Sequence, residues 1–115
     1  MSERVDALSR SFGQTIAGID LLLGSQLIHP CLVLLYSTID AAAALERDHP
    51  DSDVTGRQFI AWADRYLIQR GFVSCSAVDL YAARCGVLHT FSAASRRSRG
   101  GTAERIAYAW GTGQA

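Results

Sequence analysis

Two side chains suited to phosphate chemistry lie five residues apart in the second half of this sequence, at Arg84 and His89. A histidine can take up or release a proton near neutral pH, so it can act as a general base or acid. The planar guanidinium group of an arginine can stabilise the non-bridging oxygens of a phosphate. Such a pair is suited to acid–base chemistry at a phosphate group.

Both residues also have purely structural interpretations. Arg84 could form an ion pair with Asp40 or Asp79, and His89 could be a partly buried, hydrogen-bonded histidine. Asp40 lies in the most apolar segment of the chain, where a buried carboxylate must be paired. It could orient Arg84 or His89 in a site, or only tie two helices together. Asp40 and Asp79 are therefore the supporting residues of the candidate site, and a small anion bound at Arg84 is a further alternative.

The segment Arg84-Cys-Gly-Val-Leu-His89 resembles the R-x4-6-H motif of the HEPN superfamily (higher eukaryotes and prokaryotes nucleotide-binding). The resemblance implies a small all-α bundle that dimerises and acts as an RNA-binding protein or metal-independent ribonuclease of toxin or defence type. Arg84 and His89 would be its catalytic residues, and a cognate antitoxin would be a partner. The stretch 80–90 is also similar to segments of small uncharacterised bacterial proteins.

The spacing of the motif raises a geometric problem. At about 100° per residue, an α-helix turns roughly 500° over five residues, so the two side chains should lie about 140° apart. We expect the length of the arginine side chain, or a site shared across a dimer, to cover that angle.

Charge is divided unevenly along the chain. The formal net charge of zero argues against a general nucleic-acid or membrane binder. Residues 1–56 nevertheless hold three arginines and eight acidic residues, whereas residues 57–115 hold eight arginines and three acidic ones. The second half could offer a positive surface to an anion, or the two halves could neutralise each other. Arg96, Arg97 and Arg99 could bind RNA phosphates, although a solvated linker is an equally good explanation.

The cysteines indicate a reducing compartment and no metal site. An odd number of cysteines without a short pair favours the cytoplasm over a disulfide scaffold. Cys85 and His89 could share a metal ion with Cys75 or His49, but nothing in the spacing makes four ligands converge. We therefore expect neither a metal nor another cofactor. We also expect no membrane partner, since no apolar segment reaches about 18 residues and no signal peptide is evident.

Apolar residues that recur every three or four positions predict helices at about 3–28, 30–47, 56–70 and 76–94. A basic linker would follow at 95–101, and a period-two pattern in 102–115 predicts a short strand or turn. The 115 residues should form a single all-α domain, an antiparallel four-helix bundle. The residues expected to face inward are Phe59, Trp62, Ala63, Tyr66 and Leu67 in the third helix and Val78, Tyr81, Cys85 and Leu88 in the fourth.

The first two helices carry more apolar surface than one chain of this size can easily bury, which predicts a symmetric homodimer. The alternative to an RNA-directed function is a non-catalytic helical module for dimerisation or interaction. The orientation of Arg84 and His89 should distinguish the two. A shared polar cleft would favour chemistry, whereas burial in the core or separate exposure to solvent would favour the module.

Overall fold

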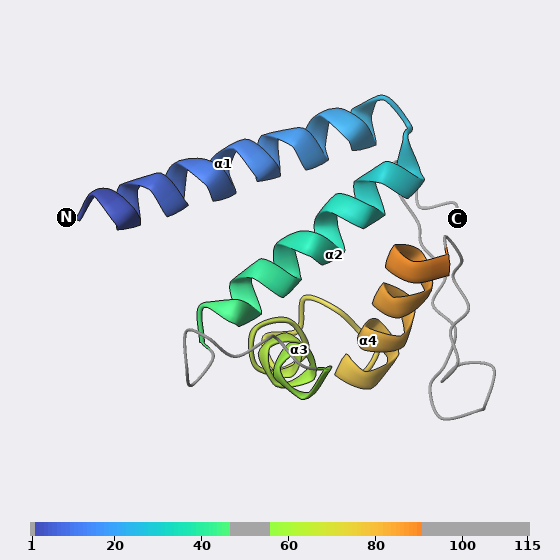
Figure 1. The fold of residues 1–115 in the computed structure, drawn as a ribbon. Coiled ribbons are helices and arrows are strands. Elements are labelled where there is room, and N and C mark those ends of the chain that lie inside the picture. The colour runs from blue at the N-terminus through green and yellow to red at the C-terminus, as the bar shows by residue number, and fades with distance from the viewer. Residues whose placement is uncertain (1, 47–55, 91–115) are drawn as a thin grey trace.

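Four helices follow one another in the part of the chain that the computed structural model describes, residues 2–46 and 56–90 (Figure 1). Two of them continue into π-helical turns, η1 after α3 and η2 after α4. The elements are α1 (Glu3–Gly24), α2 (Ile28–Ala44), α3 (Gly56–Ala63), η1 (Asp64–Ile68), α4 (Ala77–Cys85) and η2 (Gly86–Thr90). These residues contain no strand, so the prediction of an all-helical fold is confirmed for them. The predicted linker 95–101 and the C-terminal strand or turn at 102–115 lie outside the described residues.

Local signals set the boundaries of α1 and α2. The Ser2 side chain caps α1 by accepting a hydrogen bond from the backbone N–H of Val5 at 3.2 Å. The helix ends at Gly24, four residues earlier than predicted, because Gln26 adopts a left-handed conformation with φ of 59°. The next helix begins two residues before Pro30. The proline therefore lies in the first turn, where its missing N–H removes no helical hydrogen bond.

The start of α4 is the capping box that the sequence predicts. The Ser76 side chain accepts a hydrogen bond from the backbone N–H of Asp79, and the Asp79 carboxylate accepts one from the backbone N–H of Ser76, both at 3.1 Å. The α3 helix begins at Gly56, where a Cβ atom would stand only 2.7 Å from the ring of Tyr81. The absence of a side chain at Gly56 thus lets α3 approach α4 closely.

The core lies between α2, α3 and α4, and α1 packs outside it. In Figure 1, α1 lies along one side of α2, while α3 and α4 lie on the other. No residue of α1 is buried, and several of its large apolar side chains are exposed. The buried cluster consists of Tyr36, Ile39, Phe59, Ala63, Ala77, Leu80, Ala83 and Val87. None of the helices in the described ranges is long and apolar enough to cross a membrane.

The inward faces of α3 and α4 differ in part from the expectation. Phe59 and Ala63 are buried as predicted, whereas Tyr66 is only half-buried and hydrogen-bonds to Glu46. On α4 and η2 the buried face is shifted by one residue. The predicted residues Val78, Tyr81, Cys85 and Leu88 are half-buried, and the buried ones are Ala77, Leu80, Ala82, Ala83 and Val87.

Candidate active site

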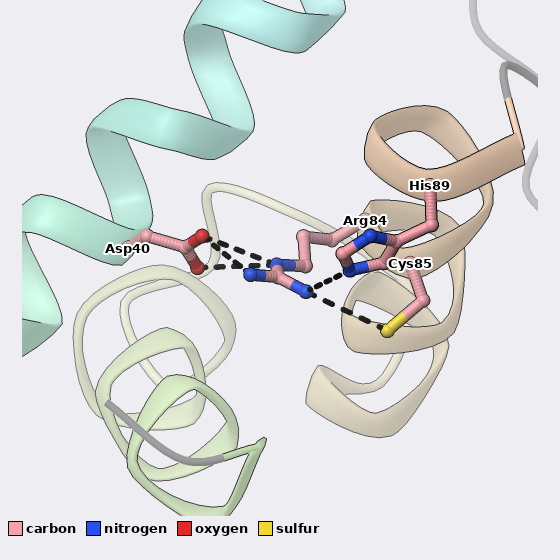
Figure 2. Close-up of polar contacts among 4 residues, drawn as sticks. All are labelled: Asp40, Arg84, Cys85 and His89. Carbon is pink, nitrogen blue, oxygen red and sulfur yellow. Dashed lines mark hydrogen bonds and ion pairs between the residues drawn. The ribbon is translucent and has the colours of Figure 1, made fainter. Parts of the chain in front are cut away.

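Arg84 joins α4 to α2 through a two-pronged ion pair with Asp40 (Figure 2). Its Nη2 donates to Oδ2 of Asp40 at 2.7 Å, and its Nε lies 3.2 Å from both carboxylate oxygens. This fork geometry is the strong form of an arginine–carboxylate contact and fixes the guanidinium plane. Of the two carboxylates considered from the sequence, Asp40 is thus the one that holds Arg84, whereas Asp79 forms the capping box.

The ion pair is partly exposed to water. The Arg84 and Asp40 side chains keep 19% and 25% of their accessible surface, respectively. Burial alone lowers the pKa of Arg84. The hydrogen bonds and negative charge of Asp40, with a smaller contribution from Cys85, outweigh that effect, and the pKa of Arg84 is raised. The guanidinium group is therefore permanently charged at a place that a ligand in solution can reach.

His89 lies beside Arg84, so the angle implied by their spacing is covered within one chain. Nη1 of Arg84 is 3.1 Å from Nε2 of His89 (Figure 2). The length of the arginine side chain contributes, and so does the η2 segment, Gly86–Thr90, which adopts π-helical geometry. Hydrogen bonding from residue i to i+5 puts more residues into each turn and so reduces the angle between residues five apart, and such turns recur at functional sites. Arg84 and His89 thus meet within one chain, without a second subunit.

The contact also bears on what His89 can do. A guanidinium group has only donors, so Arg84 can hydrogen-bond to Nε2 of His89 only where that nitrogen accepts. The His89 side chain is exposed, so the ring is accessible from solvent. Nε2 could accept a proton from a bound molecule once its contact with Arg84 is released.

Two neighbours complete the surroundings of Arg84. Its Nη1 donates to Sγ of Cys85 at 3.8 Å, and its Cζ lies 5.7 Å from the centre of the Tyr81 ring. Neither contact was predicted from the sequence, although Tyr81 and Arg84 are three residues apart on one helix face. Nη1 of Arg84 thus contacts both Cys85 and His89, the two residues considered above as shared metal ligands. No three potential metal ligands gather anywhere in residues 2–46 and 56–90.

The donors of Arg84 are almost fully used. Of its five N–H groups, those on Nε and Nη1 and one on Nη2 have partners, which leaves one Nη2 hydrogen without an acceptor among the residues that the structure describes. The contact to the Cys85 sulfur is long, and a phosphate oxygen would displace it easily. A phosphate could therefore gain two hydrogen bonds from Arg84 while Asp40 keeps its hold on the opposite edge.

The remaining predicted site residues, Arg96, Arg97 and Arg99, lie outside the described residues. No protein-family model, curated protein or solved structure matches this chain. The functional interpretation therefore depends on the geometry around Arg84.

Proposed function

We propose that this protein is a HEPN-like, metal-independent endoribonuclease built on an antiparallel four-helix bundle. The observation that carries the proposal is the 3.1 Å contact between Arg84 and His89. It joins a positioned cation to an accessible histidine, on a motif whose spacing matches the superfamily. A cytoplasmic protein of toxin or defence type, with an antitoxin as partner, is the setting that the resemblance implies.

In the proposed reaction, a phosphate oxygen of the substrate takes over the hydrogen bond from Nη1 of Arg84, and the freed Nε2 of His89 takes the proton from a ribose 2′-hydroxyl. The freed oxygen attacks the adjacent phosphorus, and the bond to the 5′-oxygen of the next nucleotide breaks. Arg84 stabilises the charge that develops on the non-bridging oxygens. The products are a 2′,3′-cyclic phosphate and a 5′-hydroxyl. The departing 5′-oxygen takes a proton from water, and His89 returns to solvent the proton that it accepted.

The test is cleavage of RNA in the presence of EDTA, with detection of 2′,3′-cyclic phosphate ends. We expect His89→Ala and Arg84→Gln to lower the rate by about 10²–10⁴, the usual contribution of a general base or a charged stabiliser. A substrate with 2′-deoxyribose at the cleaved position should resist the wild type completely. Arg10→Gln, which removes an exposed arginine of α1, is the matched control and should cleave normally. A wild type that cleaves no RNA, or that cleaves the deoxy substrate, would contradict the proposal.

The exposed apolar surface of α1 supports the homodimer within this proposal and also the alternative, a non-catalytic interaction module. Ile16 and Leu21 expose 54% and 73% of their surface in a helix without one buried residue. Light scattering should give twice the 12.4 kDa chain mass. Ile16→Glu should give the monomer, while Gln14→Glu, at an exposed polar position, should leave the dimer intact. Dimerisation without cleavage would favour the module.

A further inference from the structure

A second group of side chains, which the active site does not use, surrounds Tyr66 on the α3–η1 segment. This Tyr66 cluster consists of Glu46, Trp62, Arg65, Tyr66 and Arg70. The Cζ atoms of Arg65 and Arg70 lie 5.4 and 5.5 Å from the centre of the Tyr66 ring, and the Trp62 ring centre lies 5.1 Å from it. The Tyr66 hydroxyl donates a hydrogen bond to Glu46. Two cations and two aromatic rings are thus held together on one surface.

The positive charges of the two cluster arginines are available to an anion. Both side chains are exposed, and neither has a carboxylate within ion-pair distance among the residues that the structure describes. Their contact with the Tyr66 ring orients them without using their N–H donors. Glu46 adds one negative charge at the hydroxyl end of the ring, so the two arginines outnumber it. The cluster can therefore donate hydrogen bonds to an anion and neutralise its charge.

A hollow beside the cluster is large enough for a flat ring. It has a volume of about 140 Å³ and lies between α2 and α3, with Glu46, Trp62 and Arg65 among its lining residues. A cavity of roughly 150 Å³ accommodates benzene, so this space suits one ring of a nucleobase. A base there would contact Trp62 while its own phosphate reached an arginine.

We propose that the Tyr66 cluster binds unpaired RNA, with a base against Trp62 and the flanking phosphates on Arg65 and Arg70, which the Tyr66 ring orients. Aromatic rings interleaved with exposed cations are the combination that holds single strands, because every base has a stacking face and every nucleotide a phosphate. An acidic peptide would use the arginines but not the rings. The inference rests on the proposed function for the identity of the ligand, and it adds a contact that the cleavage site does not provide.

The test is binding of a fluorescently labelled single-stranded RNA, measured by anisotropy over a range of salt concentrations. The protein should carry His89→Ala so that no cleavage occurs. Replacing both cluster arginines by glutamine (R65Q/R70Q) should reduce the salt slope of log K by about 1.4, since each phosphate contact to a single strand contributes about 0.7. Trp62→Leu should weaken binding about tenfold through lost stacking. The pair R4Q/R10Q removes the same charge from α1 and should change neither quantity.

Further outcomes separate this inference from the proposed function. Equal binding of a duplex of the same sequence would overturn it, because paired bases cannot stack on the cluster. So would unchanged binding by R65Q/R70Q or Trp62→Leu, even if the wild type cleaves RNA. No RNA binding by the His89→Ala protein would overturn it as well. Binding that depends on the cluster, in a wild type that never cleaves, would support it while removing the ribonuclease proposal.

Discussion

Replacing Arg84 by glutamine should destabilise the fold by about 2 kcal/mol, because it leaves the Asp40 carboxylate without its cation. Breaking a fully buried ion pair costs about 3–5 kcal/mol, and an exposed pair is worth about 1 kcal/mol or less. The Arg84 and Asp40 side chains retain 19% and 25% of their accessible surface, so water can partly solvate the carboxylate that remains. The cost therefore falls between the two limits. For a domain of this size, about 2 kcal/mol lowers Tm by roughly 10 °C.

The assay is urea unfolding followed by circular dichroism, at one protein concentration because a dimer adds its own concentration dependence. Asp40→Asn should cost a similar amount to Arg84→Gln, since it leaves the guanidinium group without its carboxylate. The double variant should lose clearly less than the sum, with a coupling of about 1–2 kcal/mol. His89→Ala should stay within about 0.5 kcal/mol of wild type, because His89 is exposed. Additive losses at Asp40 and Arg84, or losses below about 0.5 kcal/mol, would refute this account of the ion pair.

Two shorter predictions follow from the packing and from the thiols. Gly56→Ala should destabilise the protein by about 1–3 kcal/mol in thermal melts, because the added Cβ would lie 2.7 Å from the Tyr81 ring. The control is Gly13→Ala, where a Cβ meets nothing within 4 Å, and this variant should not lower Tm. Burial, then the charges of nearby acids, raise the pKa of the Cys31 and Cys75 thiols, so the folded state keeps protons that the unfolded chain releases above about pH 8.5. This contribution of the thiols should be constant below that pH, and stability should fall above it; a urea midpoint that is the same at pH 7.5 and 9.5 would contradict this.

The helices were predictable because their signals are local. The three-and-four spacing of apolar residues placed all four, and the Ser76–Asp79 capping box marked the start of α4 correctly. The Gln26 turn was not predictable, since the left-handed conformation there depends on how α1 and α2 meet. The inward face of α4 was assigned to its larger side chains, yet the helix buries Ala77, Ala82 and Ala83. Small residues allow close packing, which a search for large apolar residues overlooks.

The candidate site was predictable in its members but not in its geometry. The sequence identified Asp40 as a carboxylate that needs a partner, and Arg84 as a cation able to provide one. It could not choose between Asp40 and Asp79, because that choice depends on which face of α2 meets α4. The sequence left open whether Arg84 and His89 meet within one chain or across a dimer, because an α-helical rotation was assumed through Gly86 and Val87. The π-helical turn there holds more residues per turn, which reduces the angle between residues five apart.

The ion pair with Asp40 does not oppose a catalytic role for Arg84. A stabilising cation is most effective when its orientation is fixed before the substrate arrives, and a carboxylate behind the guanidinium group provides that fixation. Asp40 holds Nε and Nη2, while Nη1 faces His89. Loss of Arg84 therefore removes both a structural link and a charge at the proposed reaction centre. Asp40→Asn separates the two contributions, since it keeps the positive charge of Arg84 but no longer fixes the orientation of the guanidinium group. A rate that falls with this variant in fully folded protein would identify Asp40 as a positioning residue, and an unchanged rate would limit it to stability.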